Sequence, residues 1–156
     1  RDEMLKHVIV CVGIVLCHAL QLPSFYGSHM LLQANRPIIS GNASSGRRVV
    51  AMIDEAMLAT TVAVAGAFRL ILPAQPPSAT GRQIVVSDGH TSIVLKDVAF
   101  GDVWFCGGQS NMEMDLSSVR NGSEVIREAT AASASIRIFT VAKSVAFEPL
   151  SNLQPL

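Results

Sequence analysis

Short runs of β-branched and apolar residues, separated by turn residues, dominate the sequence between residues 36 and 100. Such runs lie at residues 47–54, 60–66 and 68–73. In the last run Phe68, Leu70 and Leu72 occur at every second position, so a strand would place them on one face. Short strands at this spacing are typical of a small antiparallel β-sandwich, which we expect for residues 20–100.

A hairpin is expected within residues 82–98, which read as two further strands joined at Asp88-Gly89. A two-residue Asp-Gly loop supplies the positive φ angles that a tight hairpin needs. The proline-rich segment 73–81 is interpreted as a loop within the same domain, because extended runs flank it on both sides. His90, beside the hairpin turn, is interpreted as an exposed loop residue.

Composition excludes some classes of protein. The 156-residue chain carries 12 basic and 12 acidic residues, which does not favour a nucleic acid or an anionic membrane surface as partner. Apolar residues make up 49% of the chain, enough for a buried core and too many for a largely disordered protein. The length suits one ordinary domain, or one small domain with part of another.

Residues 1–19 have the pattern of a cleavable signal peptide. A short basic start, Lys6 and His7, precedes an uncharged apolar run, and small residues follow near a cleavage point at Ala19. The run is shorter than the roughly 20 residues that a membrane-spanning helix needs. We predict the secretory pathway, a secreted or lysosomal product and no stable membrane span. The alternatives are a buried N-terminal strand or helix, and an uncut leader that tethers the chain to a membrane.

The cysteine and asparagine positions fit this route. Cleavage would remove Cys11 and Cys17 and leave Cys106, so the mature chain by itself could form no internal disulfide. Cys106 has no second cysteine or histidine near it at metal-ligand spacing, so we expect no metal site and interpret it as a buried strand residue. Asn42 and Asn121 each begin an Asn-X-Ser sequon and are glycosylation candidates.

The pattern changes after Phe100. Residues 102–106 predict a short buried strand, residues 123–135 a helix with Ser123 as its N-cap, and residues 136–141 a second strand. The expected helix has an apolar stripe formed by Val125, Ile126, Ala129 and Ala132. Strand, turn, helix and strand form the opening β-α-β unit of an α/β domain. Because a parallel sheet needs more strands, we predict that residues 101–156 are the start of a truncated α/β domain.

Ser110 lies between the predicted strand and helix, just after Gly107 and Gly108. Backbone N–H groups at such a position point outward unpaired, and they can stabilise the negative oxygen that develops during acyl transfer. Glycines allow a tight turn and keep side chains away from a substrate. The Gly-X-Ser-X-Gly elbow of α/β-hydrolases is a poor match, because Met112 stands in place of its second glycine. Spacing alone leaves Ser110 as either a nucleophile or a turn residue.

The segment FGDVWFCGGQSNMEM at residues 100–114 closely resembles the nucleophile block of the sialate O-acetylesterases, members of the SGNH (GDSL-like) hydrolase superfamily. In that family the block reads much like GDVW-X-C-X-GQSNM. Upstream, SHMLLQANRP at residues 28–37 is similar to the M-V-L-Q stretch that opens the family's β domain. The resemblance covers residues 25–141 in matching order.

This resemblance implies that Ser110 is the catalytic nucleophile and that its backbone N–H is one oxyanion donor. It implies that Gly108, Gln109 and Asn111 shape the turn around it. Gly107 departs from the pattern, because many relatives carry serine there. The resemblance also implies a flavodoxin-like, SGNH-type hydrolase domain after the β domain. The family's remaining oxyanion residues, and the aspartate and histidine that activate the serine, come later in the chain than this sequence extends.

The expected function is therefore removal of O-acetyl groups from acetylated sialic acid or another acetylated sugar, through an acyl-enzyme on Ser110 and without a metal or organic cofactor. A serine without its base is a poor nucleophile at neutral pH, so we expect this chain alone to be inactive. The alternative is a non-catalytic β-sandwich module that binds carbohydrate or a protein. Such a module needs an exposed aromatic platform, and Trp104 lies in a run that we expect to be buried.

Overall fold

The computed structural model describes residues 19–143, 145–148, 150, 152 and 153. The predicted signal peptide lies outside the described residues, apart from Ala19. The strands are β1 (Leu31–Gln33), β2 (Ile38–Asn42), β3 (Arg48–Ile53), β4 (Ala56–Val62), β5 (Ala67–Ile71), β6 (Ser78–Ser87) and β7 (Ser92–Gly101). The helices are α1 (Gly122–Ala131) and the single 3-10 turns η1 (Ser110–Met112), η2 (Leu116–Ser118) and η3 (Ser133–Ser135). In the described part of the chain, none of these helices has the length and apolar character to cross a membrane.

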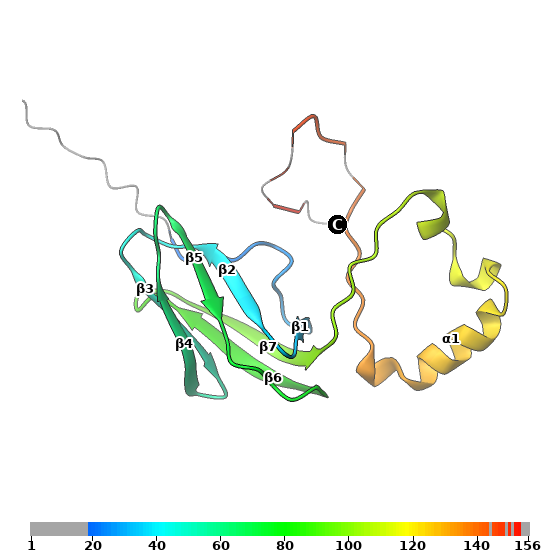
Figure 1. The fold of residues 1–156 in the computed structure, drawn as a ribbon, viewed down its shortest axis with the longest axis horizontal. Helices are drawn as coiled ribbons and strands as arrows, with labels where there is room; N and C mark the ends of the chain where they lie inside the picture. The colour runs from blue at the N-terminus through cyan, green and yellow to red at the C-terminus, as the bar shows by residue number, and fades with distance from the viewer. Residues whose placement is uncertain (1–18, 144, 149, 151, 154–156) are drawn as a thin grey trace, which may run out of the picture.

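The strands form two sheets that pack into one β unit (Figure 1). The larger sheet has five strands in the order β1-β7-β6-β3-β4, and the smaller pairs β2 with β5. Neighbouring strands are antiparallel except β1, which runs parallel to β7 with Leu31 opposite Ala99. The prediction of an antiparallel sandwich is therefore correct in part, because two sheets form but the larger one is mixed and curled.

Alternation along the strands places the core between the sheets. On β3 the side chains of Val49, Ala51 and Ile53 are fully buried, while the residues between them are partly exposed. The same alternation on β5 buries Phe68 and Leu70, and the predicted common face of these two residues is confirmed. Full burial of one Val, Leu, Ile or Phe side chain stabilises the fold by about 1.5–3 kcal/mol. The core members with no exposed surface include Ile39, Val49, Ile53, Ile84, Val86 and Val98.

The hairpin between β6 and β7 lies where the sequence predicts it, but its loop is longer than two residues. β6 ends at Ser87 and β7 begins at Ser92, so residues 88–91 form the connection. One carboxylate oxygen of Asp88 accepts hydrogen bonds from the backbone N–H groups of His90 at 2.9 Å and Thr91 at 2.7 Å. Asp88 therefore caps the loop with its side chain instead of serving as one half of a two-residue turn. His90 is exposed, as predicted.

The two strands predicted after Phe100 do not form. Residues 102–108 and 136–143 run without a strand partner among the described residues, and Figure 1 shows α1 lying apart from the sheets. A parallel strand requires neighbouring strands. Neither of these two segments has such a neighbour in the part of the chain that the structure describes. Trp104 and Cys106, predicted to be buried, are exposed for the same reason.

The predicted helix forms with different ends. α1 begins at Gly122, and its N-cap is Asn121 rather than Ser123. A Cβ atom at Gly122 would lie 1.9 Å from the carbonyl oxygen of Leu116, so this glycine lets η2 pack against the start of α1. The predicted apolar stripe is not buried, because Val125 is 41% exposed and its neighbour Ile126 is 39% exposed.

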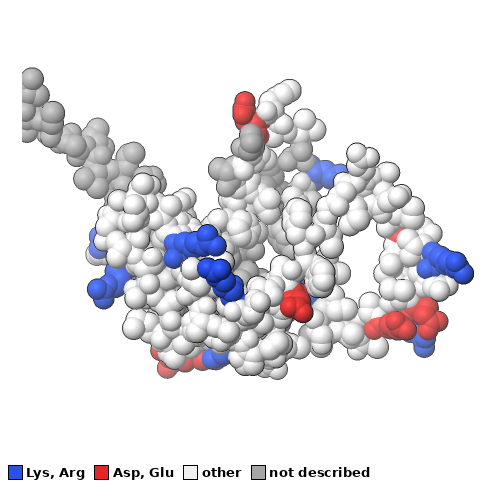
Figure 2. Space-filling view, in the orientation of Figure 1, with Lys and Arg blue, Asp and Glu red and all other residues white. Residues whose placement is uncertain are grey.

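Charged residues make up only 15% of the chain. Figure 2 shows small separate groups of both signs on one face, with broad uncharged areas between them. This distribution agrees with the equal numbers of basic and acidic residues in the sequence.

Candidate functional site

Ser110 is the first residue of η1 and is exposed to solvent. Two backbone hydrogen bonds make the turn: the Met112 N–H donates to the Gln109 carbonyl at 2.8 Å, and the Glu113 N–H donates to the Ser110 carbonyl at 3.1 Å. Gln109, Ser110 and Asn111, which are predicted site residues, therefore occupy one tight and exposed turn. All three residues of this turn are open to solvent.

The glycine before this turn has a steric role. A Cβ atom at Gly108 would lie 2.5 Å from Cγ of Met112. Real Cβ atoms do not approach other atoms so closely, so any side chain at position 108 would displace Met112. The absence of a side chain at Gly108 lets Met112 fold back over the start of η1. Gly107 has more room, because a Cβ atom there would lie 3.3 Å from its nearest neighbour, Cε1 of Phe105.

The two donor groups of Ser110, its hydroxyl and its backbone N–H, differ from its carbonyl, which accepts the Glu113 N–H. Within the described residues, neither the hydroxyl nor the backbone N–H of Ser110 has a hydrogen-bond partner. No histidine or acidic side chain in the described part of the chain makes a hydrogen bond with the hydroxyl. The described residues also contain no cluster of three His, Cys, Asp or Glu side chains suited to a metal ion.

A His–Asp pair is present in the β unit, away from the η1 turn. His29 Nδ1 lies 2.7 Å from Asp97 Oδ2. Two hydrogen bonds hold the pKa of Asp97 below its ordinary value. The larger effect comes from His29 and the smaller from Arg137. The partners of Asp97 among the described residues are thus His29 and Arg137 rather than Ser110.

The two sequence blocks that carry the family resemblance lie side by side. β1 includes the Leu-Leu-Gln part of the upstream block and pairs with the end of β7, which leads into the nucleophile block. The Gln33 side-chain oxygen accepts a hydrogen bond from the Val103 backbone N–H at 2.9 Å, and its Nε2 donates to Asp102 Oδ1 at 3.3 Å. Sequence reasoning missed Gln33, although its place in a block shared with the same family was an available signal.

A second contact approaches the η1 turn from the segment after α1. Lys143 Nζ lies 2.6 Å from Glu113 Oε1, with 81% and 60% of the two side chains exposed. An ion pair as exposed as this contributes little to stability, about 0–1 kcal/mol.

Both glycosylation candidates are exposed. Asn42 ends β2, where its backbone pairs with that of Gln21, and Asn121 is the N-cap of α1 with a φ of 61°. Neither lies in the η1 turn, so the structure does not bring the sequons together with Ser110.

The similar proteins of known function that we report are sialate O-acetylesterases. The sialate O-acetylesterase of Rattus norvegicus is 31% identical over 141 residues, which are 83% of this chain and 26% of that protein. The sialate O-acetylesterase of Mus musculus is 48% identical over 59 residues, which are 38% of this chain and 11% of that protein. No family model matches the sequence.

A solved structure shares the fold. The crystal structure of a carbohydrate acetylesterase from Xanthomonas citri matches with a TM-score of 0.70 and 28% sequence identity, covering 87% of this chain and 31% of that one. The chain thus spans about a quarter to a third of the relatives that it matches over most of its length. By sequence and by fold, the chain is sialate O-acetylesterase-like, which confirms the resemblance predicted from its motifs.

Proposed function

We propose that this chain is the nucleophile-bearing part of a carbohydrate esterase that removes O-acetyl groups from sialic acid or other acetylated sugars. The observation that carries the proposal is the similarity of 83% of the chain to a sialate O-acetylesterase. The solved carbohydrate acetylesterase that shares its fold supports the same class of substrate.

Ser110 is the proposed nucleophile. Its oxygen attacks the acetyl carbonyl, the sugar oxygen leaves with a proton, and water then hydrolyses the acetyl-serine to acetate and free serine. The Ser110 backbone N–H is the proposed oxyanion donor, and its lack of an acceptor among the described residues suits that role. Gly108, Gln109 and Asn111 shape the turn. The reaction needs no metal or organic cofactor.

The proposed division of the chain follows from this role. Residues 20–100 form a β domain, and residues 101–156 begin an SGNH-type hydrolase domain that further polypeptide completes. Residues 1–19 direct the product into the secretory pathway, where it is secreted or lysosomal. Residues 102–108 and 136–143 pair with no strand among the described residues, which supports the idea that other strands belong beside them.

Activity in this proposal requires a base from outside the described residues. In serine hydrolases, loss of the base costs on the order of a million-fold in rate, so the 156-residue chain should show no hydrolysis above background. The test compares it with a longer polypeptide that supplies the aspartate and histidine blocks, using 4-nitrophenyl acetate and an O-acetylated sialic acid.

The Ser110→Ala change should abolish hydrolysis by the longer polypeptide, while Ser117→Ala should leave it intact. Ser117 is the matched control because it is an exposed serine in the nearby turn η2. Hydrolysis that persists unchanged in Ser110→Ala would defeat the proposed role of Ser110.

A non-catalytic carbohydrate-binding module is the second candidate, and one observation favours it. Trp104 and Phe105 are 83% and 96% exposed, which provides the aromatic surface that such a module needs. The discriminating measurement is the binding of acetylated and unacetylated sialosides by the chain carrying Ser110→Ala. Equal binding of both sugars that is lost in Trp104→Ala would favour the module over the esterase.

A further inference from the structure

Arg137 is partly buried, although the residues on either side of it are exposed. It has 16% of its side chain exposed, whereas the neighbouring residues Ile136 and Ile138 are exposed at 47% and 86% of the whole residue. An arginine that is more buried than the isoleucines on either side reverses the usual preference of these residue types. Its burial therefore needs specific partners.

The partners are oxygens of the β unit. Nη2 donates to Asp97 Oδ1 at 3.0 Å and to the Ala79 carbonyl at 3.3 Å. Nη1 donates to the Met30 carbonyl at 3.3 Å and to the Asp97 carbonyl. We call these acceptors of Met30, Ala79 and Asp97 the guanidinium socket. They come from the loop before β1, from β6 and from β7, so the socket exists only when the sheet is folded.

Local irregularities of the sheet accompany the acceptors of Ala79 and Asp97, whereas the Met30 carbonyl also accepts a hydrogen bond from the Ala99 N–H at 3.0 Å. The β6–β7 pairing shifts register between Ser78 and Arg82, which takes the Ala79 carbonyl out of the regular ladder. Asp97 has a left-handed backbone with a φ of 54°. A Cβ atom at Gly81 would lie 1.8 Å from Asp97 Oδ1, so only glycine at this position leaves room for the carboxylate.

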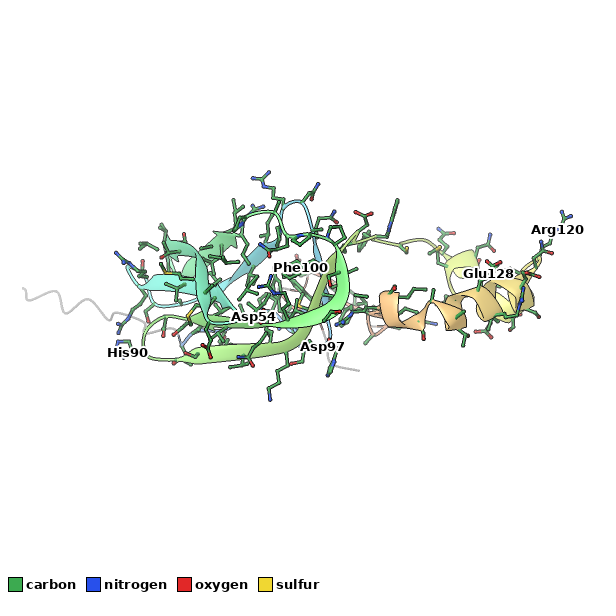
Figure 3. All side chains as sticks on the ribbon, turned by 90° about the horizontal axis from the view of Figure 1, so that it is seen from below. Asp54, His90, Asp97, Phe100, Arg120 and Glu128 are labelled. Carbon is green, nitrogen blue, oxygen red and sulfur yellow. The ribbon has the colours of Figure 1, made fainter. Side chains whose placement is uncertain are left out.

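His29 orients the socket from the other side. Its hydrogen bond to Oδ2 of Asp97 leaves Oδ1 of the same carboxylate for Arg137. Figure 3 shows Asp97 at the end of the sheet that faces the segment leaving α1, and Arg120 and Glu128 far from it on the helical part. The socket thus meets the chain just after α1 and η3.

We propose that the guanidinium socket is an intramolecular docking site, and that Arg137 in it acts as a latch that fixes the segment after α1 to the β unit. Gln33 holds the chain where it leaves β7, and the latch holds it where it returns. The excursion that carries Ser110 is therefore fastened at both ends. The latch stands independently of the esterase proposal, because it depends on contacts and not on activity.

The acceptors explain why the latch is an arginine. Four oxygens are arranged around one planar group, and a guanidinium offers five N–H donors in a rigid fork. A lysine ammonium is a compact charge with three donors, and it cannot match the same spread of acceptors. Lysine at position 137 should therefore restore only part of the docking.

The experiment measures chymotrypsin cleavage after Phe139 in the complete 156-residue chain. Phe139 is 62% exposed and lies two residues beyond the latch. Arg137→Met should raise the cleavage rate about tenfold, and Arg137→Lys should raise it less. The matched control is Arg127→Met, which removes a 73% exposed arginine of α1 and should leave the rate unchanged.

Asp97→Asn provides the second variant, because asparagine tolerates the left-handed backbone while lacking the charge. It should raise the same rate, and the double variant with Arg137→Met should be no faster than Arg137→Met alone. Equal rates in Arg137→Met and Arg127→Met would overturn the latch, as would additive effects in the double variant. Arg137→Met leaves the β unit's own residues untouched, so its result stands even if Asp97→Asn unfolds.

Discussion

The side-chain oxygen of Gln33 accepts a hydrogen bond from the backbone N–H of Val103 at 2.9 Å. This contact joins the strand that opens the large sheet to the chain that leaves its neighbour β7 and leads to Ser110. Gln33 also lies opposite Gly101 in the parallel ladder. Its backbone and its side chain therefore both hold the chain at the point where it leaves β7. The start of the proposed nucleophile segment is thus held in place by a residue that lies about seventy positions earlier in the sequence.

Removal of this hydrogen bond should make the chain after β7 more mobile without unfolding the sheet. A hydrogen bond of this kind contributes about 1 kcal/mol, so Gln33→Ala should speed hydrogen exchange of the Val103 amide about fivefold. Gln83→Ala is the control, because Gln83 is an exposed glutamine on β6. An unchanged Val103 exchange rate in Gln33→Ala would show that the contact does not hold the segment.

Replacing an isoleucine by alanine should lower the free energy of unfolding far more in the core than on the surface. Ile84 is fully buried on β6, and Ile84→Ala should lower the free energy of unfolding by about 2–5 kcal/mol. Ile71 on β5 is 48% exposed, and Ile71→Ala should cost less than about 1 kcal/mol. Urea unfolding followed by far-UV circular dichroism measures both. Similar losses from the two variants would contradict the described core.

Gly41 is expected to tolerate no side chain. A Cβ atom there would lie 2.2 Å from the carbonyl oxygen of Gln21, so Gly41→Ala must push two backbone segments apart. We expect a loss of about 1–3 kcal/mol in unfolding free energy. Gly27→Ala is the control, because nothing lies within 4 Å of its constructed Cβ position. Equal unfolding midpoints for the two variants would refute this packing.

Acid should weaken the β6–β7 hairpin through Asp88. Hydrogen bonds from the backbone of Thr91 and His90 hold the pKa of Asp88 below its ordinary value of 3.8, and the charges of His90 and Arg47 lower it further. A carboxyl whose pKa is lowered by folding stabilises the folded state above its unfolded pKa, and this stabilisation is lost as pH falls through the folded value.

Asp88→Asn tests that sign. The variant should be less stable than the parent chain at pH 7, and the gap should shrink as pH falls below about 4 because the parent loses its ionised carboxylate. Urea midpoints measured across that range check it. A gap that stays constant with pH would show that the charge of Asp88 contributes nothing.

The sequence predicted the parts of the fold that depend on local pattern. Alternation placed Phe68 and Leu70 correctly on one buried face, and Asp88-Gly89 marked the hairpin. It missed the pairing of β1, because the three residues of Leu31–Gln33 are too few to show a period and their partner lies far along the chain. Contacts of this kind depend on topology rather than on local propensity.

The larger error concerned residues 102–106. An apolar run predicts burial only if another element is present to cover it, and among the described residues nothing covers Trp104. The guanidinium socket was unpredictable for a different reason. It depends on a register shift near Ala79 and a left-handed backbone at Asp97, neither of which has a distinct residue signature.

The proposed function depends above all on Ser110 as the nucleophile of an acetylesterase. The most direct measurement treats the longer polypeptide that supplies the missing base with an acetyl ester under rapid quench, and locates the acetyl group by peptide mass spectrometry. We predict acetylation of the Ser110 hydroxyl that forms and decays at the rate of turnover. Turnover with the acetyl group on another residue, and none on Ser110, would contradict it.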